Sequence, residues 1–331
     1  MESDRNNWST AALVVAHPSH ELRVHGWLQT SRPFVFVLTD GSGRAAEPRL
    51  ESTTKVLADL GAETGSIYGR FTDLEVYEAF LKRDFTLFIG LAEELADQFI
   101  RHQIEYVVAD SDEGYSPTHD ACRLLTDAAV EIVKRRHKQK IASFDFAVVG
   151  PPDECPERIR KRAIWIHLAD DAFTRKVAAV RSYDAKLALD VEAALGGELF
   201  KGVKRFSAPQ LAGAVDTELS NQVVAALHGY PRIEERFKDA FGGIELNRFR
   251  TECLRPVCAF ADRQPSRREI PFYELYGRKM VTAGHYSRPI RYAEHFLPLA
   301  EAVWRHVQSC SEVNDELLPN EFLNSANAAT S

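Results

Sequence analysis

The sequence predicts an α/β fold, with a Rossmann-like, mostly parallel sheet and helices on both of its faces. Short runs rich in β-branched and aromatic residues alternate with longer segments whose apolar residues recur at helical spacing. This alternation is typical of parallel strands joined by crossover helices. The predicted strands are 11–16, 34–39, 66–71, 104–109, 141–149 and 164–168, and the predicted helices are 50–60, 74–82, 87–102 and 119–133.

The first elements carry the clearest local signals. Residues 11–16 (AALVVA) and 34–39 (FVFVLT) are short apolar runs of strand length, typical of buried strands. The helix at 50–60 is followed directly by Gly61, and glycine is the residue type that most often ends a helix. The strand at 66–71 then completes a strand–helix–strand unit.

The later elements continue the same rhythm. Apolar residues at helical spacing predict the helices at 74–82 and 87–102, and β-rich runs predict the strands that follow. The helix at 119–133 leads into the basic run RRHKQK (135–140). Cations interact favourably with the carboxyl end of a helix, so this run is interpreted as a solvated helix end.

The domain organisation changes after about residue 185. Helical segments dominate from there, and an aromatic-rich stretch with several arginines occupies 269–296. We therefore expect an α/β domain over 1–190 and a C-terminal α+β extension over 191–308 that could cap a site. The remaining residues, 309–331, are polar with little periodicity, and we expect them to form a disordered tail.

The composition excludes several functional classes. The 331-residue chain has a net charge of −7, which leaves no basic surplus to offset the phosphates of a nucleic acid. No apolar run approaches the ~18 residues of a membrane span, and the polar start MESDRNNWST has no signal-peptide core. The five cysteines form no CxxC pair, which favours reduced thiols. We expect a cytoplasmic protein. The sequence does not decide whether the protein forms a homo-oligomer.

The stretch AHPSHELRVHGW (16–27) follows the first strand and holds three histidines. His17 and His20 form an HxxH pair, and His119 lies where a helix begins after the strand that ends near Asp110. Ligands of such folds bind at the carboxyl ends of the strands. A catalytic zinc takes three protein ligands and keeps one open position. We therefore expect His17, His20 and His119 to bind one divalent metal, Zn2+, while a polar loop and an ordinary helix start remain the alternative.

Residues 11–185 resemble the LmbE-like, or PIG-L, family of zinc-dependent N-deacetylases. The matching features follow one another in the family's order: AHPSHE (16–21) for the family's AHPDDE, Gly26, TDG (39–41), LG (60–61), Asp73, SPTH (116–119) for HPDH, and the helix FTRKVAAVRSYD (173–184). The resemblance implies a Rossmann-like domain that holds one zinc and cleaves N-acyl groups.

The resemblance also implies which residues carry the chemistry. The family's three zinc ligands correspond to His17, His20 and His119, with histidine in place of the family's aspartate at position 20. The family's catalytic base corresponds to Ser19, and a supporting histidine corresponds to Ser116. Serine cannot take a proton from water near neutral pH, so an active enzyme needs another base.

Several residues near the predicted ligands could supply the missing chemistry. Glu113 is the first choice for the base, because a flexible Glu-Gly-Tyr loop could reach the metal. Glu21 matches the family's own glutamate and fits a supporting role at a helix start. Asp110 could orient a histidine, and Tyr115 could donate to a developing oxyanion. Each of them could instead be a solvated loop residue.

The expected function is a zinc-dependent hydrolase that removes an N-acyl group, such as acetyl, from an amino sugar or a sugar-bearing metabolite. The substrate would be a small molecule, an acylated amino sugar or a glycoconjugate. We expect the stretch 269–296, with Tyr286 and Arg288, to pack against the metal-bearing face and contact substrate; ordinary packing is the alternative. The competing function is a binding or regulatory protein that has kept the fold and lost catalysis.

Overall fold

A seven-stranded, mostly parallel sheet lies at the centre of the computed structural model, which describes residues 10–43, 47–183, 246–257 and 270–310. The strand order is β3-β2-β1-β4-β5-β7-β6. Strands β1 to β5 run parallel, and β7 is antiparallel to both of its neighbours. The strands are β1 (Ala11–Val15), β2 (Phe34–Thr39), β3 (Glu63–Phe71), β4 (Tyr106–Asp110), β5 (Ala142–Phe146), β6 (Ile164–His167) and β7 (Thr251–Pro256).

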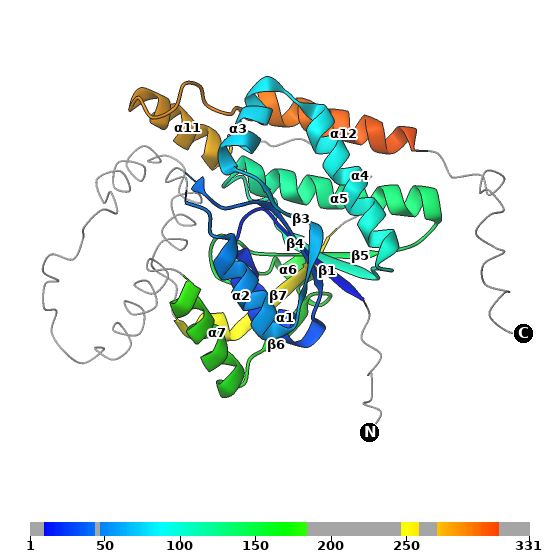
Figure 1. Cartoon of the computed structure of the whole chain (residues 1–331), viewed down its shortest axis with the longest axis vertical. Coiled ribbons are helices and arrows are strands. Elements are labelled where there is room, and N and C mark those ends of the chain that lie inside the picture. Colours follow the sequence, from blue (N-terminus) through cyan, green and yellow to red (C-terminus); the bar gives the residue numbers. More distant parts are fainter. Residues whose placement is uncertain (1–9, 44–46, 184–245, 258–269, 311–331) are drawn as a thin grey trace, which may run out of the picture.

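Helices cover both faces of the sheet (Figure 1). One face carries α3 (Asp73–Lys82), α4 (Phe85–Arg101), α5 (Pro117–His137) and α12 (Leu297–Ser309), and the other carries α1 (His25–Ser31), α2 (Leu50–Leu60) and α7 (Asp170–Tyr183). Shorter elements are η1 (His20–Val24), α6 (Glu157–Arg160), η3 (Leu246–Arg250), α11 (Phe272–Thr282) and η5 (Tyr292–Phe296). The predicted α/β fold class is confirmed.

The central strand β1 shows why its sequence is apolar throughout. Ala12 and Val14 belong to the core beneath α4, α5 and α12, whereas Leu13 and Val15 belong to the core on the side of α1 and α2. Successive side chains of a strand point to opposite faces, so a strand covered on both sides needs an unbroken apolar run. Gly61 ends α2 with a φ of 67°, as the glycine after that helix predicted.

The described segments after residue 190 pack together with the α/β domain. Strand β7, from the predicted extension, lies inside the main sheet between β5 and β6, and α12 packs against α4 and α5. The sequence of β7, TECLRP, has neither a continuous apolar run nor a clean alternation, which is why it was not predicted. The rest of the expected extension, at 191–245 and 258–269, and the expected tail beyond Cys310 lie outside the described residues.

A buried ion pair explains how β7 is held in place. Glu252 of β7 is 1% exposed, and Lys176 of α7 donates to its Oε1 at 2.8 Å. The same carboxylate accepts hydrogen bonds from the backbone N–H groups of Gly26 (2.8 Å) and Trp27 (2.9 Å) in the first turn of α1. The first N–H groups of a helix have no partner within the helix, so Glu252 acts as a cap supplied by a distant strand.

The close approach of β7 requires glycine at position 26. A Cβ atom there would lie 2.1 Å from Cδ2 of Leu168 and 3.3 Å from both carboxylate oxygens of Glu252. We expect Gly26→Ala to lower the free energy of unfolding by about 1–3 kcal/mol, because the added methyl group overpacks a filled site. Gly90→Ala in α4 is the matched control. No described atom would lie within 4 Å of its Cβ, so it should stabilise the helix by about 0.5–1 kcal/mol. Urea unfolding of both variants measures the difference, and equal effects would contradict the packing explanation.

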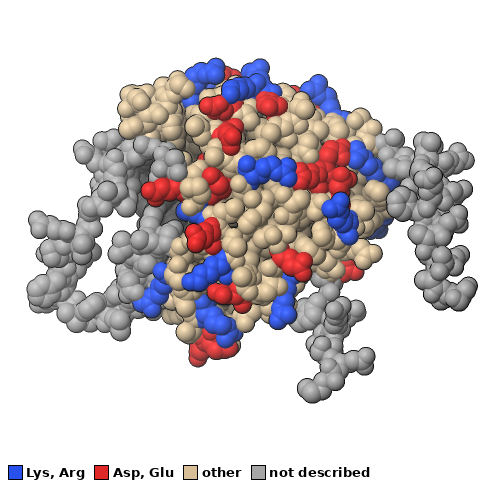
Figure 2. Space-filling view, viewed as in Figure 1, with Lys and Arg blue, Asp and Glu red and all other residues tan. Residues whose placement is uncertain are grey.

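The surface of the described part carries mixed charge. On the face shown in Figure 2, Lys and Arg side chains are interspersed with Asp and Glu side chains. Ion pairs one helical turn apart in the described part include Lys82 with Glu78 and Arg175 with Asp171. Among the described helices, none combines the length and the apolar character needed to cross a bilayer.

Candidate metal centre

Three histidine rings meet at the carboxyl edge of the sheet. The ring centroids of His17 and His20 are 5.4 Å apart, those of His17 and His119 are 5.1 Å apart, and those of His20 and His119 are 4.6 Å apart. His17 and His20 follow β1, and His119 lies in the first turn of α5, which follows β4. Because β1 and β4 are parallel neighbours, their carboxyl ends deliver these side chains to one place.

A tight turn, rather than a helix face, brings His17 and His20 together. The short 3-10 helix η1 begins at His20, so His17 lies outside it. Between them Ser19 has a φ of 88°, in the left-handed region that a non-glycine residue adopts at a cost of roughly 1–2 kcal/mol. A strained turn of this kind is typical of a functional site. The turn at Ser19 therefore places the two imidazoles of the HxxH pair beside each other.

His17 is oriented by two residues from neighbouring strands. Its Nδ1 lies 2.8 Å from Oγ1 of Thr39, at the end of β2, and 2.9 Å from Oδ1 of Asp73, directly after β3. The Thr39 hydroxyl donates to the carbonyl of Ala16 (3.1 Å), so it accepts from Nδ1 of His17. Nδ1 then carries the proton, and Nε2 of His17 is left with the lone pair that binds a metal.

His20 is oriented by Asp110. Its Nδ1 lies 2.8 Å from Oδ2 of Asp110, which also accepts from the backbone N–H of Ala16 at 2.8 Å. Asp110 is fully buried at the end of β4. An ionised carboxylate only accepts, so Nδ1 of His20 is the protonated nitrogen and Nε2 again has the lone pair. A carboxylate behind a histidine is the usual arrangement around a metal, and it agrees with the orienting role predicted for Asp110.

The third histidine has a buried nitrogen that needs a partner. His119 is 4% exposed, and its Nδ1 has no hydrogen-bond partner in the part of the chain that the structure describes. Burial lowers the pKa of His119 well below its usual range, and the nearby His20 and His17 lower it further. Burial also lowers the pKa of His20, although Asp110 opposes this. Zn2+ binds the neutral form of imidazole, so the lowered pKa values of His20 and His119 favour the form that a divalent metal would need.

The carboxylate of Glu21 is buried against α2 and α7. It is fully buried, and its Oε1 accepts from the Thr53 hydroxyl at 2.9 Å; Thr53 in turn lies 2.5 Å from the hydroxyl of Tyr183 in α7. Burial raises the pKa of Glu21 to about 7. These contacts join the turn that holds the histidines to α2 and α7.

The loop before α5 holds the other two predicted residues. Glu113 accepts a hydrogen bond from the backbone N–H of Val149 at 2.9 Å, which fixes its carboxylate to the loop after β5. The ring of Tyr115 lies 5.9 Å from the ring of His119 and stacks in parallel on Phe272, at 5.1 Å and 3°. Burial raises the pKa of Tyr115, which keeps its hydroxyl protonated as an oxyanion donor must be. Tyr115, like Asp110, therefore lies against the histidine cluster.

Two residues that hold His17 were not among the predicted site residues. Thr39 ends β2 and Asp73 comes two residues after β3, and the three strands lie in the order β3-β2-β1. Their positions at strand ends were the available signal. Ser116 caps α5: its hydroxyl accepts from the N–H of Thr118 at 3.3 Å. Ser116 therefore positions the helix that carries His119.

The aromatic stretch near the C-terminus lies on the same side as the histidines. Phe272 stacks on Tyr115, and the N–H of Tyr273 donates to the carbonyl of Gly114 at 3.3 Å. The hydroxyl of Tyr77, in the helix that begins at Asp73, donates to the backbone carbonyl of Arg288. These contacts agree with the expectation that the stretch packs against this face of the domain.

The chain matches no known protein-family model, and no curated protein is a significant match to it.

Proposed function

We propose that this protein is a zinc-dependent hydrolase that removes an N-acyl group, such as acetyl, from an amino sugar or a sugar-bearing metabolite. One observation carries the proposal: three buried or half-buried imidazoles converge at the carboxyl ends of parallel strands, and two of them have Nδ1 held by carboxylate or hydroxyl groups. The motifs that resemble the LmbE-like N-deacetylases supply the reaction type.

Zinc, when bound by His17, His20 and His119, supplies a Lewis acid that polarises an amide carbonyl and makes water nucleophilic near neutral pH. The chain's own residues supply the rest. Tyr115, beside His119, donates its hydroxyl proton to the developing oxyanion. Glu113, held in position by Val149, accepts the proton of the attacking water and returns it to the leaving amine.

A second function is favoured by the two serines. Ser19 stands where the resembling family has its base, and Ser116 serves as a helix cap instead of a catalytic histidine. A protein that binds an acylated sugar without cleaving it would need neither the base nor the supporting histidine. This binding or regulatory role predicts metal binding without turnover.

The deciding comparison is Glu113→Gln against Glu21→Gln. Turnover on a panel of acylated amino sugars and metal content should be measured on the same samples. We expect Glu113→Gln to lose about 10²–10⁴-fold in turnover while it keeps its metal, because a positioned acid/base is worth that much. Glu21→Gln should keep most of the turnover, because Glu21 bonds to Thr53 within helix packing.

Two outcomes would contradict the assignment. Full turnover by metal-loaded Glu113→Gln would remove Glu113 as the base. Zinc binding by the wild type without hydrolysis of any substrate in the panel would favour the binding function.

A further inference from the structure

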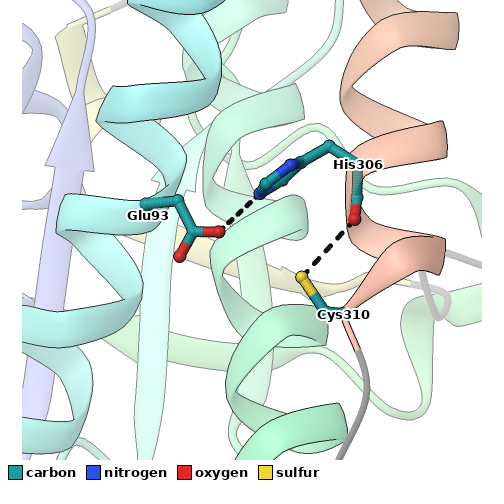
Figure 3. A group of neighbouring side chains, drawn as sticks. All are labelled: Glu93, His306 and Cys310. Atoms are coloured by element: carbon teal, nitrogen blue, oxygen red, sulfur yellow. Dashed lines mark hydrogen bonds and ion pairs between the residues drawn. The ribbon is translucent and has the colours of Figure 1, made fainter.

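A second group of metal-binding side chains lies on the helical layer, where the end of α12 meets α4 (Figure 3). Glu93 comes from α4, and His306 and Cys310 come from the end of α12 and the residue after it. His306 and Cys310 are four residues apart, so they lie on one side of the helix. One ligand atom of each residue lies within 4.8 Å of the other two.

The positively charged side chain of Arg136 lies at the edge of this cluster. Arg136 of α5 donates to both carboxylate oxygens of Glu93, at 2.6 and 2.7 Å, and its Nη2 lies 3.1 Å from Sγ of Cys310. Nε2 of His306 lies 2.5 Å from Oε1 of Glu93. Burial raises the pKa of Glu93, but the hydrogen bonds from Arg136 and His306 outweigh this and lower it. The three ligands thus surround a place that attracts positive charge.

We propose that Glu93, His306 and Cys310 form a binding site for a thiophilic divalent cation such as Zn2+, which takes the place of Arg136 between the carboxylate and the thiol. Thiolate, imidazole and carboxylate are the three ligand types that zinc uses in proteins. Ligand atoms around a tetrahedral zinc lie roughly 3–4 Å apart, from the usual bond lengths, so small rotations close the set. Binding releases the thiol proton to solvent, since the coordinating sulfur is a thiolate.

The surroundings allow an ion to enter without unfolding. The side chains of His306 and Glu93 are 28% and 25% exposed, whereas Cys310 is 8% exposed. A bound ion would join α12 to α4 and so fasten the end of the described C-terminal helix. This site is independent of the histidine centre and of the hydrolase function. Cysteine is the distinguishing ligand, because the histidine centre contains no thiol.

Cobalt(II) is the probe that separates the two sites. A cobalt ion bound by a thiolate shows a charge-transfer band in the near ultraviolet, and an ion bound by imidazoles alone does not. We expect chelator-stripped full-length protein to show this band on titration with Co2+, and His119→Ala to keep it. Cys310→Ser and His306→Gln should lose the band while remaining folded by circular dichroism. Cys155→Ser is the matched control, because Cys155 is a half-buried cysteine far along the chain from this cluster.

The variant Arg136→Met distinguishes a metal site from a cluster that only forms ion pairs. Removing the competing guanidinium should tighten Co2+ binding at the thiol several-fold. If the cluster only forms ion pairs between neighbouring helices, the wild type will show no thiolate band, and Arg136→Met will not create one. Either that result, or loss of the band in Cys155→Ser instead of Cys310→Ser, would overturn the proposal.

Discussion

Replacing His119 with alanine should leave a folded protein that no longer binds metal at the histidine centre. A three-ligand site that loses one imidazole keeps two, which is too few for a stable zinc site. We expect the affinity to fall by more than about 100-fold, since loss of an outer hydrogen-bond partner alone costs about 10–100-fold. Metal content after dialysis measures this, with Cys310→Ser in the background so that ions at the second site are not counted.

The stability of the same variant provides an independent readout. Metal bound only to the folded state adds about 2.7 kcal/mol when its free concentration is 100 times the dissociation constant. Wild type should therefore lose thermal stability on chelation, and His119→Ala should not. His25→Ala is the matched control, because His25 is also a buried histidine, 3% exposed, and lies outside the cluster. Burial lowers the pKa of His25 to about 4, so it too is neutral.

Asp110→Asn should give a graded effect that tests the orientation of His20. The amide can present its nitrogen to His20, which removes the acceptor that holds Nδ1 in its protonated form. Metal affinity should fall by about 10–100-fold without complete loss. Equal metal content in wild type, Asp110→Asn and His119→Ala would show that the cluster does not bind metal.

The meeting of His17, His20 and His119 could be predicted because it follows from topology. Polar residues after parallel strands share one edge of the sheet, whatever the details of the loops. The hydrogen-bond partners of His17 could not be found in this way. Many polar residues follow strands, and Asp73 reaches His17 only because β3, β2 and β1 are neighbours in that order. The strand order is a long-range property that local patterns do not contain.

The place of β7 was missed for a related reason. Its six residues include Glu252 and Arg255, which look like solvent-facing residues in the sequence. Glu252 is buried because Lys176 and the first turn of α1, about 76 and 225 residues away in the chain, supply its partners. Arg255 pairs in the same manner with Asp145 of β5 at 2.6 Å. Charged residues whose partners lie far away in the chain do not show a hydrophobic pattern in the sequence, so their burial cannot be predicted from it.

The largest effect on stability is expected from Lys176→Met. The substitution keeps most of the volume of the lysine but leaves the carboxylate of Glu252 buried without its cation. Removing one partner of a buried ion pair typically costs about 3–5 kcal/mol. We expect about 3 kcal/mol, at the lower end, because the N–H groups of Gly26 and Trp27 still donate to the carboxylate.

Arg175→Met provides the matched control on the neighbouring residue of the same helix. Arg175 pairs with Asp171 at 2.9 Å, but the two side chains are 47% and 70% exposed. Exposed ion pairs contribute about 0–1 kcal/mol, so this variant should unfold at nearly the same urea concentration as wild type. The double variant Lys176→Met with Glu252→Gln removes both buried charges, and it should be less destabilised than the two single changes added together.

The same variants test whether β7 supports the histidine turn. Glu252 caps α1, and α1 continues directly from η1, which begins at His20. If the cap holds that segment in place, Lys176→Met should also weaken metal binding at the histidine centre, and Arg175→Met should not. Metal titrations below the unfolding transition separate this effect from global stability. Lys176→Met and Arg175→Met could instead unfold at the same urea concentration and bind metal equally. The buried ion pair would then neither stabilise the sheet nor position the site, because loss of the lysine would have left the Glu252 carboxylate without its cation and changed nothing.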